Sequence, residues 1–204
     1  MVDEKMGRKY ELRQRADAMA ATRRRIAEAT IELHGSIGPA RTTIAGIAAL
    51  AGVQRHTVYR HFPTDEDLFA ACSTQYWEQH PWPDPQGWSV IEPATTRLAV
   101  ALGDLYAFYT AVAPMLSNVL RDAEAVPVAA RTLQPYHVYL DQVIAVLTAA
   151  FPVGPDGQPI LDAAVRHATA FGTWQSLAGQ QRLATADAIT LMTAMIQGTQ
   201  VAGR

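Results

Sequence analysis

The sequence lacks most of the features on which catalytic chemistry depends. It has a single cysteine, Cys72, so no disulfide can form within the chain. It has no glycine-rich phosphate loop and no serine or cysteine in a motif typical of a nucleophile. Its six histidines are scattered without the spacing of metal ligands. We therefore expect no catalytic residues, no metal and no cofactor, and keep a helical hydrolase or transferase only as the enzyme alternative.

Long hydrophobic runs are also missing. The best candidate, residues 143–151, is shorter than the ~18 residues that a membrane helix needs, and it contains Thr148. The first 25 residues are rich in charged side chains and lack the apolar stretch of a secretory signal. A lone cysteine in the apolar surroundings of residues 68–71 is expected to be buried and reduced. These absences predict a cytoplasmic protein without a membrane segment.

Strand-like alternation is absent over any useful length, whereas apolar residues recur at spacings of three and four almost throughout, which predicts an all-α fold. The segment His80–Trp88 holds three prolines and a glycine, so we expect domains of residues 1–79 and 80–204 to meet there. Helices are expected near residues 22–35 and 65–79, with two short helices between them. Further helices are expected near residues 93–112, 114–123, 127–150, 160–180 and 186–199. Pro135 is a candidate break in the helix of residues 127–150.

The net charge of −2 conceals a strong asymmetry. Residues 1–61 hold eleven Lys and Arg against six Asp and Glu, whereas residues 62–204 hold six against thirteen. A basic N-terminal part attracts phosphate backbones, and an acidic remainder is repelled by them. The charge pattern therefore favours nucleic-acid binding by the N-terminal part.

The segment from Thr42 to Phe62 spaces its small and apolar residues as two short crossing helices require. Ala48 is small enough for close approach, Gly52 can adopt the positive φ of a tight turn, and Thr43 can cap the first helix. Apolar residues at helical spacing form the shared inner face: Ile44, Ile47, Ala51, Val53 and Val58. This pattern predicts a helix-turn-helix.

The second of these helices leaves long donors and hydroxyls on its outer side: Gln54, Arg55, His56, Thr57, Tyr59, Arg60 and His61. A helix with such a face fits the major groove of DNA, where Arg binds guanine and His or Thr contacts base edges. We assign Arg55, His56 and Thr57 to base reading. The alternative is an ordinary surface helix whose polar residues are merely solvated.

Residues 43–69, TIAGIAALAGVQRHTVYRHFPTDEDLF, resemble the DNA-binding domain of the TetR family of transcriptional regulators. The Ala-Gly-Val, Thr-Val-Tyr and Tyr-x-His-Phe-Pro elements carry the resemblance. It implies a three-helix helix-turn-helix DNA-binding domain followed by a larger helical ligand-binding and dimerisation domain. It also implies that Thr43, Tyr59 and His61 bind phosphates, which positions the protein without reading sequence. Gln54 and Arg60 suit either kind of contact.

Two positions depart from the family pattern. His56 stands where a small residue or proline is common, which is expected to alter the operator preference, and Asp65 stands where a lysine often reaches phosphate. Basic residues of the N-terminal extension offer a replacement by binding phosphates or entering a minor groove, the alternative being a solvated tail. These residues are Lys5, Arg8, Lys9, Arg13 and Arg15.

The acidic part is expected to sense a ligand, to dimerise, or both. The small residues of Ile160–Gly179 allow close helix approach. The resemblance implies that this segment and a second helix form a four-helix dimer interface between two copies of the chain; the second helix carries Ile189, Leu191, Met192, Met195 and Ile196. The alternative is that both helices belong to an intrachain core. Ligand-pocket candidates are Tyr106, Tyr109, Met115, Tyr136, His137, Tyr139, Phe171, Trp174 and Gln175. By resemblance, a small-molecule inducer would shift the conformational population through the helix after Thr64.

The sequence as a whole therefore predicts a DNA-binding transcriptional regulator, in particular a ligand-responsive repressor. Its expected partners are a palindromic double-stranded operator, a second copy of the chain and a small-molecule inducer, without a membrane. A short recognition helix buries too little surface for operator affinity alone, so two half-sites are expected. The alternative from the same class of DNA binders is an architectural protein that coats DNA without operator or ligand.

Overall fold

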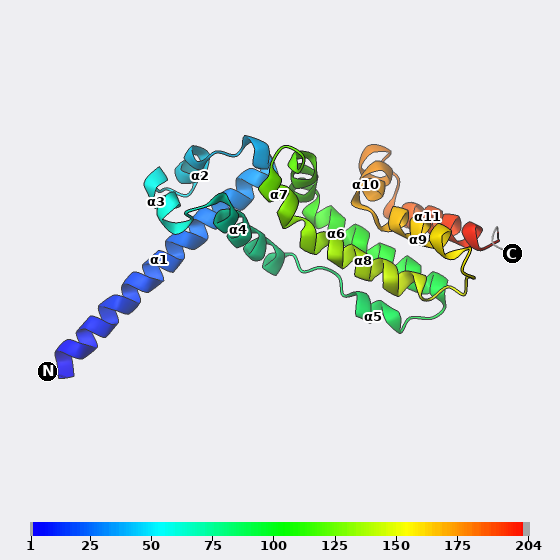
Figure 1. Ribbon diagram of the computed structural model, residues 1–204, viewed down its shortest axis with the longest axis horizontal. Coiled ribbons are helices and arrows are strands. Elements are labelled where there is room, and N and C mark those ends of the chain that lie inside the picture. Colours follow the sequence, from blue (N-terminus) through cyan, green and yellow to red (C-terminus); the bar gives the residue numbers. More distant parts are fainter. Residues whose placement is uncertain (1, 202–204) are drawn as a thin grey trace. The chain divides into compact units, whose positions relative to one another are not determined.

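The computed structural model describes the backbone of residues 2–201 and the side chains of residues 10, 11 and 13–198. Every regular element in this range is helical (Figure 1), which confirms the predicted all-α fold. The elements are, in chain order, α1 (Val2–Ser36), a 3-10 turn η1 (Pro39–Arg41), α2 (Ile44–Leu50), α3 (Arg55–His61), α4 (Asp65–Gln79), α5 (Pro85–Ser89), α6 (Ala94–Asp122), α7 (Pro127–Thr132), α8 (Gln134–Thr148), α9 (Gln158–Thr169), α10 (Phe171–Trp174), a π-helical segment η2 (Gln175–Gln180) and α11 (Thr185–Val201).

The chain divides into two compact units. The first unit comprises Met1–Gln79 and Pro114–Leu133, and the second comprises His80–Ala113 and Gln134–Arg204. Helix α6 contributes residues to both units. The packing of residues 114–133 with the N-terminal segment is a long-range contact that no local pattern announces. The assignment of separate DNA-binding and regulatory roles to residues 1–79 and 80–204 stays a prediction.

Helix α1 is much longer than expected, because it begins at Val2 rather than near Thr22. Its last third has an apolar inner stripe at helical spacing, in which Ile26, Ala29 and Thr30 are buried. The described side chains from Tyr10 to Ala21 are exposed, so they give no apolar periodicity to read. Ala, Arg, Glu, Leu and Met dominate this stretch and have high helix propensity, which explains why the helix continues without a core contact.

Helix α4 begins and ends where the sequence predicts. The Thr64 hydroxyl accepts a hydrogen bond from the Asp67 N–H at 3.1 Å, and the Asp67 carboxylate accepts one from the Thr64 N–H at 3.2 Å. This reciprocal pair is a capping box. The segment after Gln79 was expected to be a loop, yet it contains α5, because Pro85 occupies a first-turn position and Asp84 accepts from the Gln86 N–H.

Helix α6 continues through Pro114, where two helices were predicted. Proline has no N–H, so Pro114 cannot donate the usual helical hydrogen bond. Burial of the apolar residues before and after it offsets this loss, since Val112, Met115 and Leu116 are all buried. The expectation that no segment has the length and hydropathy of a membrane helix was also wrong, because α6 passes that test. Leu98, Leu102, Leu105, Tyr106 and Tyr109 are fully buried, so α6 is a core helix.

In the second unit, α9 packs against both α8 and α11. The predicted break near Pro135 is present, since α7 ends at Thr132 and α8 begins at Gln134. The helix expected over residues 160–180 is interrupted, because Ala170 has extended φ and ψ, and a π-helical segment follows α10. Met192 and Ile196 on α11 are buried within the unit, so these two residues belong to an intrachain core.

Candidate nucleic-acid interface

The turn between α2 and α3 has the geometry that the sequence predicts. Gly52 has φ +65°, the left-handed conformation that side chains with a Cβ disfavour. The Val53 N–H donates to the Ala48 carbonyl at 2.9 Å, and the Gly52 N–H donates to the Ala49 carbonyl at 3.3 Å. These two bonds make a Schellman motif, which ends α2 and redirects the chain into α3.

A small apolar core supports the two helices from beneath. Ile47, Ala48 and Ala51 of α2 and Val58 of α3 are buried, and Ile44 and Val53 pack against them while half-buried. Helices α1 and α4 close this core through Ile26, Ala29 and Leu68, with Phe62 after α3. The predicted inner face is therefore confirmed, and its residues fix which side of α3 points outward.

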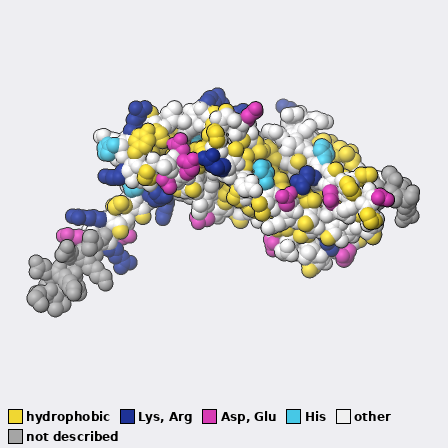
Figure 2. Space-filling model, viewed as in Figure 1, with side chains coloured by type: hydrophobic (Ala, Val, Ile, Leu, Met, Phe, Trp, Pro, Cys, Tyr) yellow, Lys and Arg dark blue, Asp and Glu magenta, His cyan; other side chains and the backbone are white. Residues whose placement is uncertain are grey.

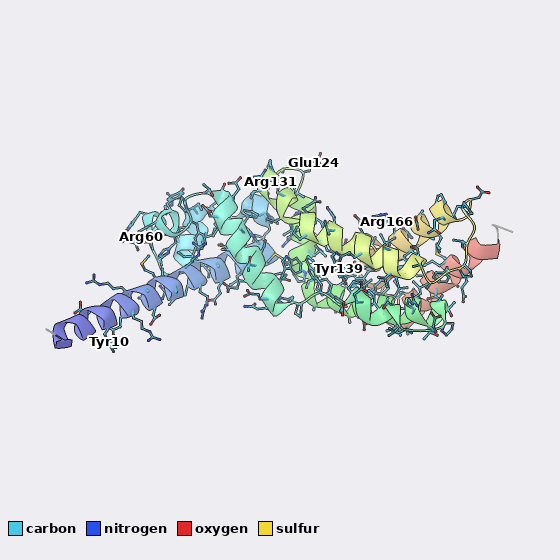
Figure 3. The ribbon with its side chains drawn as sticks, turned by 60° about the horizontal axis from the view of Figure 1, so that its bottom comes forward. Tyr10, Arg60, Glu124, Arg131, Tyr139 and Arg166 are labelled. Carbon is cyan, nitrogen blue, oxygen red and sulfur yellow. The ribbon has the colours of Figure 1, made fainter. Side chains whose placement is uncertain are left out.

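The outer side of α3 presents the polar residues to solvent. Gln54, Arg55, His56, Tyr59 and Arg60 are exposed, and Thr57 is half-buried. Figure 3 labels Arg60 on this helix. A protruding helix whose exposed side chains are donors has the shape and chemistry of a major-groove reader. The role of each of these residues toward bases or phosphates stays a prediction.

His61 does not lie on that outer side, so the sequence-based placement of its side chain was wrong. The residue is only 9% exposed, and its buried Nε2 has no hydrogen-bond partner among the described residues. Burial, together with the charges of Arg60 and Arg23, lowers the pKa of His61 below its usual value. Its predicted phosphate contact would require the ring to turn outward.

Arg23 on α1 is a positioning residue that the sequence analysis did not single out. Its guanidinium donates to the His61 carbonyl at the end of α3 and lies 4.1 Å from the centre of the Phe62 ring. A cation at the carboxyl end of a helix interacts favourably with its dipole, and a guanidinium over an aromatic ring adds a cation–π contact. A run of three arginines gives no sign of which one does this.

Thr43 serves the first helix as a cap. Its Oγ1 accepts a hydrogen bond from the Gly46 N–H at 3.1 Å, as predicted. The residue is exposed, and capping uses only a lone pair of the hydroxyl. The O–H therefore remains available to donate, at a helix N-terminus that favours an anion. This geometry is compatible with the predicted phosphate contact.

The basic N-terminal extension is a helix rather than an irregular arm (Figure 1). Arg13 and Arg15 are exposed on it, whereas the side chains of Lys5, Arg8 and Lys9 lie outside the described residues. Figure 2 shows Lys and Arg side chains along α1 and around the helix-turn-helix, and Figure 3 shows Tyr10 on the part of α1 away from the other helices of its unit. A basic surface thus accompanies the helix-turn-helix.

The end of α6 holds the segment that leads into α2. The Asn118 amide donates to the carbonyls of His34 and Gly35 at 3.0 and 2.8 Å, which caps the end of α1. The Asp122 carboxylate accepts from the Ala40 N–H at 2.9 Å, and the adjacent Arg121 guanidinium holds the pKa of this carboxyl below its usual range. Sequence reasoning missed this clamp, because its partners lie more than 80 residues apart.

Six of the nine predicted ligand residues form one aromatic cluster in the second unit. Tyr109 lies edge-on to Phe171 with ring centres 5.4 Å apart, and its hydroxyl donates to the Thr169 carbonyl at 2.6 Å. Tyr136 donates to the Tyr109 hydroxyl at 3.3 Å. The members, all buried, are Tyr106, Tyr109, Tyr136, Tyr139, Phe171 and Trp174. Burial raises the pKa of Tyr106 and of Tyr136 to about 12.

The other three predicted ligand residues lie elsewhere. His137 is exposed on α8, and Gln175 is half-buried in η2. Met115 belongs to the first unit, where it lines a cavity with residues of α1 and α4. Six of the nine candidates therefore pack together, whereas the contribution of each residue to a ligand site stays a prediction.

Some apolar side chains of the second unit are left exposed. Leu191 and Met195, one turn apart on α11, are 43% and 51% exposed, and Ile160 on α9 is 53% exposed.

Among the described residues, no group of three or more His, Cys, Asp or Glu is placed to hold a metal ion. Cys72 is buried as predicted, and burial raises the pKa of its thiol to about 12.

A helix-turn-helix with an outward polar helix, within an all-helical chain, defines the class of DNA-binding regulatory proteins. Residues 26–72 match the family model described as bacterial regulatory proteins, tetR family. The segment that contains the helix-turn-helix therefore matches the DNA-binding domain of TetR-family transcriptional regulators, as the resemblance predicted. Regulators of this family are transcription factors rather than enzymes. No curated protein matches the chain.

Solved structures share the fold over most of their length. A tetR-family transcriptional regulator from Streptomyces coelicolor superposes with a TM-score of 0.62 at 18% identity, over 90% of this chain and 82% of its own. Salmonella enterica GusR gives 0.56 at 17% identity, over 88% and 95%. A TetR transcription regulator from Haloarcula marismortui gives 0.55 at 16% identity, over 90% and 98%. At these identities the likeness concerns the fold.

Proposed function

We propose that this DNA-binding regulator is a cytoplasmic, ligand-responsive repressor that binds a palindromic operator as a homodimer. The observation that carries the DNA part is the outer side of α3, where Arg55, His56 and Tyr59 are exposed while Val58 anchors the helix from below. By this proposal Arg55, His56 and Thr57 read base edges. Thr43 and Tyr59 bind phosphates.

Homodimer formation is supported from both ends of the chain. One recognition helix of seven residues buries too little surface for operator affinity, so two copies are needed. Leu191 and Met195 of α11 and Ile160 of α9 offer exposed apolar surface. Burying it between two copies removes apolar area from water, and the small Ala163 nearby allows close approach.

A ligand response is supported by the polar groups of the aromatic cluster. The Tyr139 hydroxyl and the Trp174 Nε1 are buried and have no hydrogen-bond partner among the described residues. An unpaired buried donor costs about 1–3 kcal/mol, which a ligand with matching acceptors would recover. An inducer acts if it binds better to a conformation in which the recognition helices are misplaced for successive grooves.

The decisive experiment selects bound fragments from random double-stranded DNA with the purified full-length protein. An inverted repeat with half-sites about one helical turn apart is the expected result. If six to eight phosphates are neutralised per dimer, log K should fall against log salt with a slope of about −5 to −7. Recovery of no repeat would point to an architectural binder, and a flat salt response would contradict DNA binding through the basic surface.

Sedimentation of the protein with the selected fragment then tests the stoichiometry. Two chains per inverted repeat are expected. Leu191→Arg and Met195→Arg together should weaken self-association, because they would place charges in the proposed apolar contact. Val90→Arg is a matched control, because Val90 is also an exposed apolar residue but lies outside α9 and α11. Equal self-association of all three proteins would exclude this face.

A further inference from the structure

The first unit contains a small cavity that the aromatic cluster does not reach. Helices α1, α4, α6 and α7 surround it, and its volume is about 40 Å³. Its walls are mainly apolar, with Phe69 and Trp77 from α4, Met115 and Val119 from α6, and Leu133 after α7. All of these residues belong to the first unit.

His34 is the most buried polar side chain in this wall. It is 3% exposed, and its ring lies 4.7 Å from the Phe69 ring. The Asn118 amide donates to the backbone carbonyl of His34 and not to its ring. Burial lowers the pKa of His34 to about 4, although the Asp122 charge opposes this shift. At neutral pH the ring is uncharged and can donate from one nitrogen and accept at the other.

The cavity and the helix-turn-helix core contact different faces of the same two helices, α1 and α4. On α1, Leu33 packs against the helix-turn-helix core while its neighbour His34 lines the cavity. On α4, Leu68 and Ala71 pack against the helix-turn-helix core, whereas their neighbours Phe69 and Cys72 line the cavity. A displacement of these helices by a molecule in the cavity is therefore transmitted directly to the supports of α2 and α3.

We propose that this cavity is a regulatory site for a small, uncharged, mainly apolar molecule whose single hydroxyl or carbonyl group hydrogen bonds to the His34 imidazole. The inference rests on the proposed DNA-regulatory function and adds a second ligand site to it. The molecule is uncharged, because the walls offer no counter-ion beside His34 and burial of an unpaired charge is costly. Its polar group supplies a hydrogen-bond partner to the His34 ring inside the cavity.

Binding of a ring requires the cavity to open. A volume of about 40 Å³ accepts only a few atoms, whereas an apolar cavity that takes up benzene measures about 150 Å³. Met115 is the side chain best suited to yield, because its unbranched thioether chain has several low-energy conformations. Opening moves α1 and α4 apart and shifts the core beneath α3, so ligand binding and DNA binding should oppose each other.

Phenol serves as the probe, and benzene, which lacks the hydroxyl, is its matched control. The full-length protein carries ¹³C-labelled methionine methyl groups, and phenol is titrated while methyl NMR spectra are recorded. We expect a saturable shift of the Met115 methyl signal and none at Met192 or Met195 in the second unit. Benzene should bind about 3- to 10-fold more weakly, since it forgoes one hydrogen bond.

Two variants and their controls test the location. Val119→Phe fills the cavity and should abolish the Met115 shift, whereas Leu120→Phe, on a neighbouring position of α6 that does not line the cavity, should preserve it. His34→Phe keeps a ring of similar size and should remove the preference for phenol over benzene. An unsaturable Met115 shift, an unchanged shift in Val119→Phe, or a retained preference in His34→Phe would overturn the site.

The regulatory role is tested with the selected DNA fragment. Phenol should lower the affinity of the wild-type protein for DNA at least 3-fold and leave that of Val119→Phe unchanged, with Leu120→Phe behaving like the wild type. A saturable Met115 shift without any change in DNA affinity would overturn the coupling. Failure to bind an inverted repeat in the absence of phenol would instead refute the proposed function, so the two failures are distinguishable.

Discussion

The helix-turn-helix and the aromatic cluster use the same kinds of residue in opposite ways. Tyr59 on α3 is 55% exposed, whereas Tyr109 in the cluster is fully buried and donates to the Thr169 carbonyl. His56 is exposed on α3, whereas His34 is buried on α1. The residue type alone therefore does not assign a role. Side chains on α3 are free to serve a partner, and those in the cluster primarily stabilise the fold.

The largest expected effect comes from removing a ring of the cluster. Tyr109→Ala should lower the free energy of unfolding by about 3–5 kcal/mol, because it leaves a cavity and removes the contacts with Phe171 and Trp174. Tyr109→Phe should cost about 1–2 kcal/mol, since the hydroxyl loses its bond to the Thr169 carbonyl and the bond that it accepts from Tyr136. Chemical denaturation followed by circular dichroism measures both.

Tyr59→Ala is the matched control from the helix-turn-helix. Its ring is largely exposed, so its loss should change the free energy of unfolding by less than about 0.5 kcal/mol. If Tyr109→Ala were as mild as Tyr59→Ala, the cluster would not be a packed core. That outcome would make it a preformed ligand site instead.

These two regions also differ in how far their structure could be predicted from the sequence. The helix-turn-helix contacts are local: Gly52, Ala48 and Val53 close the turn within six residues, so spacing and residue type suffice. The pairing of Tyr109 with Thr169, or of Asn118 with His34, joins residues 60 to 84 positions apart. No periodicity in a single sequence specifies such partners.

The same physical limit explains the errors within the candidate site. His61 carries a side chain typical of DNA contacts, yet the packing around Arg23 and Phe62 encloses it. Helix α1 extends to Val2 through propensity alone, which leaves no apolar pattern to mark its beginning. Residue types predicted the chemistry of the site, whereas tertiary packing decided which side chains are available.

Lowering the pH should separate the interior histidine from the exposed one. Because the pKa of His34 is about 4 in the folded state and near 6.5 when unfolded, the unfolded state binds more protons between these values. Stability is therefore fully present above pH 6.5 and falls as the pH drops toward 4, by up to about 3 kcal/mol. Urea denaturation at intervals of half a pH unit measures the slope.

The matched variants assign that slope to one residue. His34→Phe should lose most of the decrease between pH 6.5 and 4, because it has no proton to bind. His56→Phe, altered on the exposed side of α3, should retain it. Identical slopes in the wild type and His34→Phe would contradict the burial of an uncharged imidazole at this position.

On the DNA side, Arg55→Ala and Tyr59→Phe should fail in different ways. Arg55→Ala is expected to reduce discrimination between the selected site and its base-substituted versions by about 1–3 kcal/mol, since it loses a base contact. Tyr59→Phe removes only a hydroxyl and should weaken all DNA fragments alike. Fluorescence anisotropy with matched and mismatched fragments distinguishes them, and uniform weakening by Arg55→Ala would show that it binds phosphate.

The smallest effect tests the backbone of the turn rather than any side chain. Gly52→Ala should lower the free energy of unfolding by about 1 kcal/mol, because φ +65° is unfavourable for a residue with a Cβ. Nothing lies within 4 Å of the added Cβ, so the cost arises from the conformation and not from a clash. Gly87→Ala, with equal space within the helix α5, should be neutral or slightly stabilising. The melting temperature should therefore fall in Gly52→Ala. In Gly87→Ala it should stay unchanged or rise slightly. A matching loss in both would mean that the left-handed turn does not limit the stability of the helix-turn-helix.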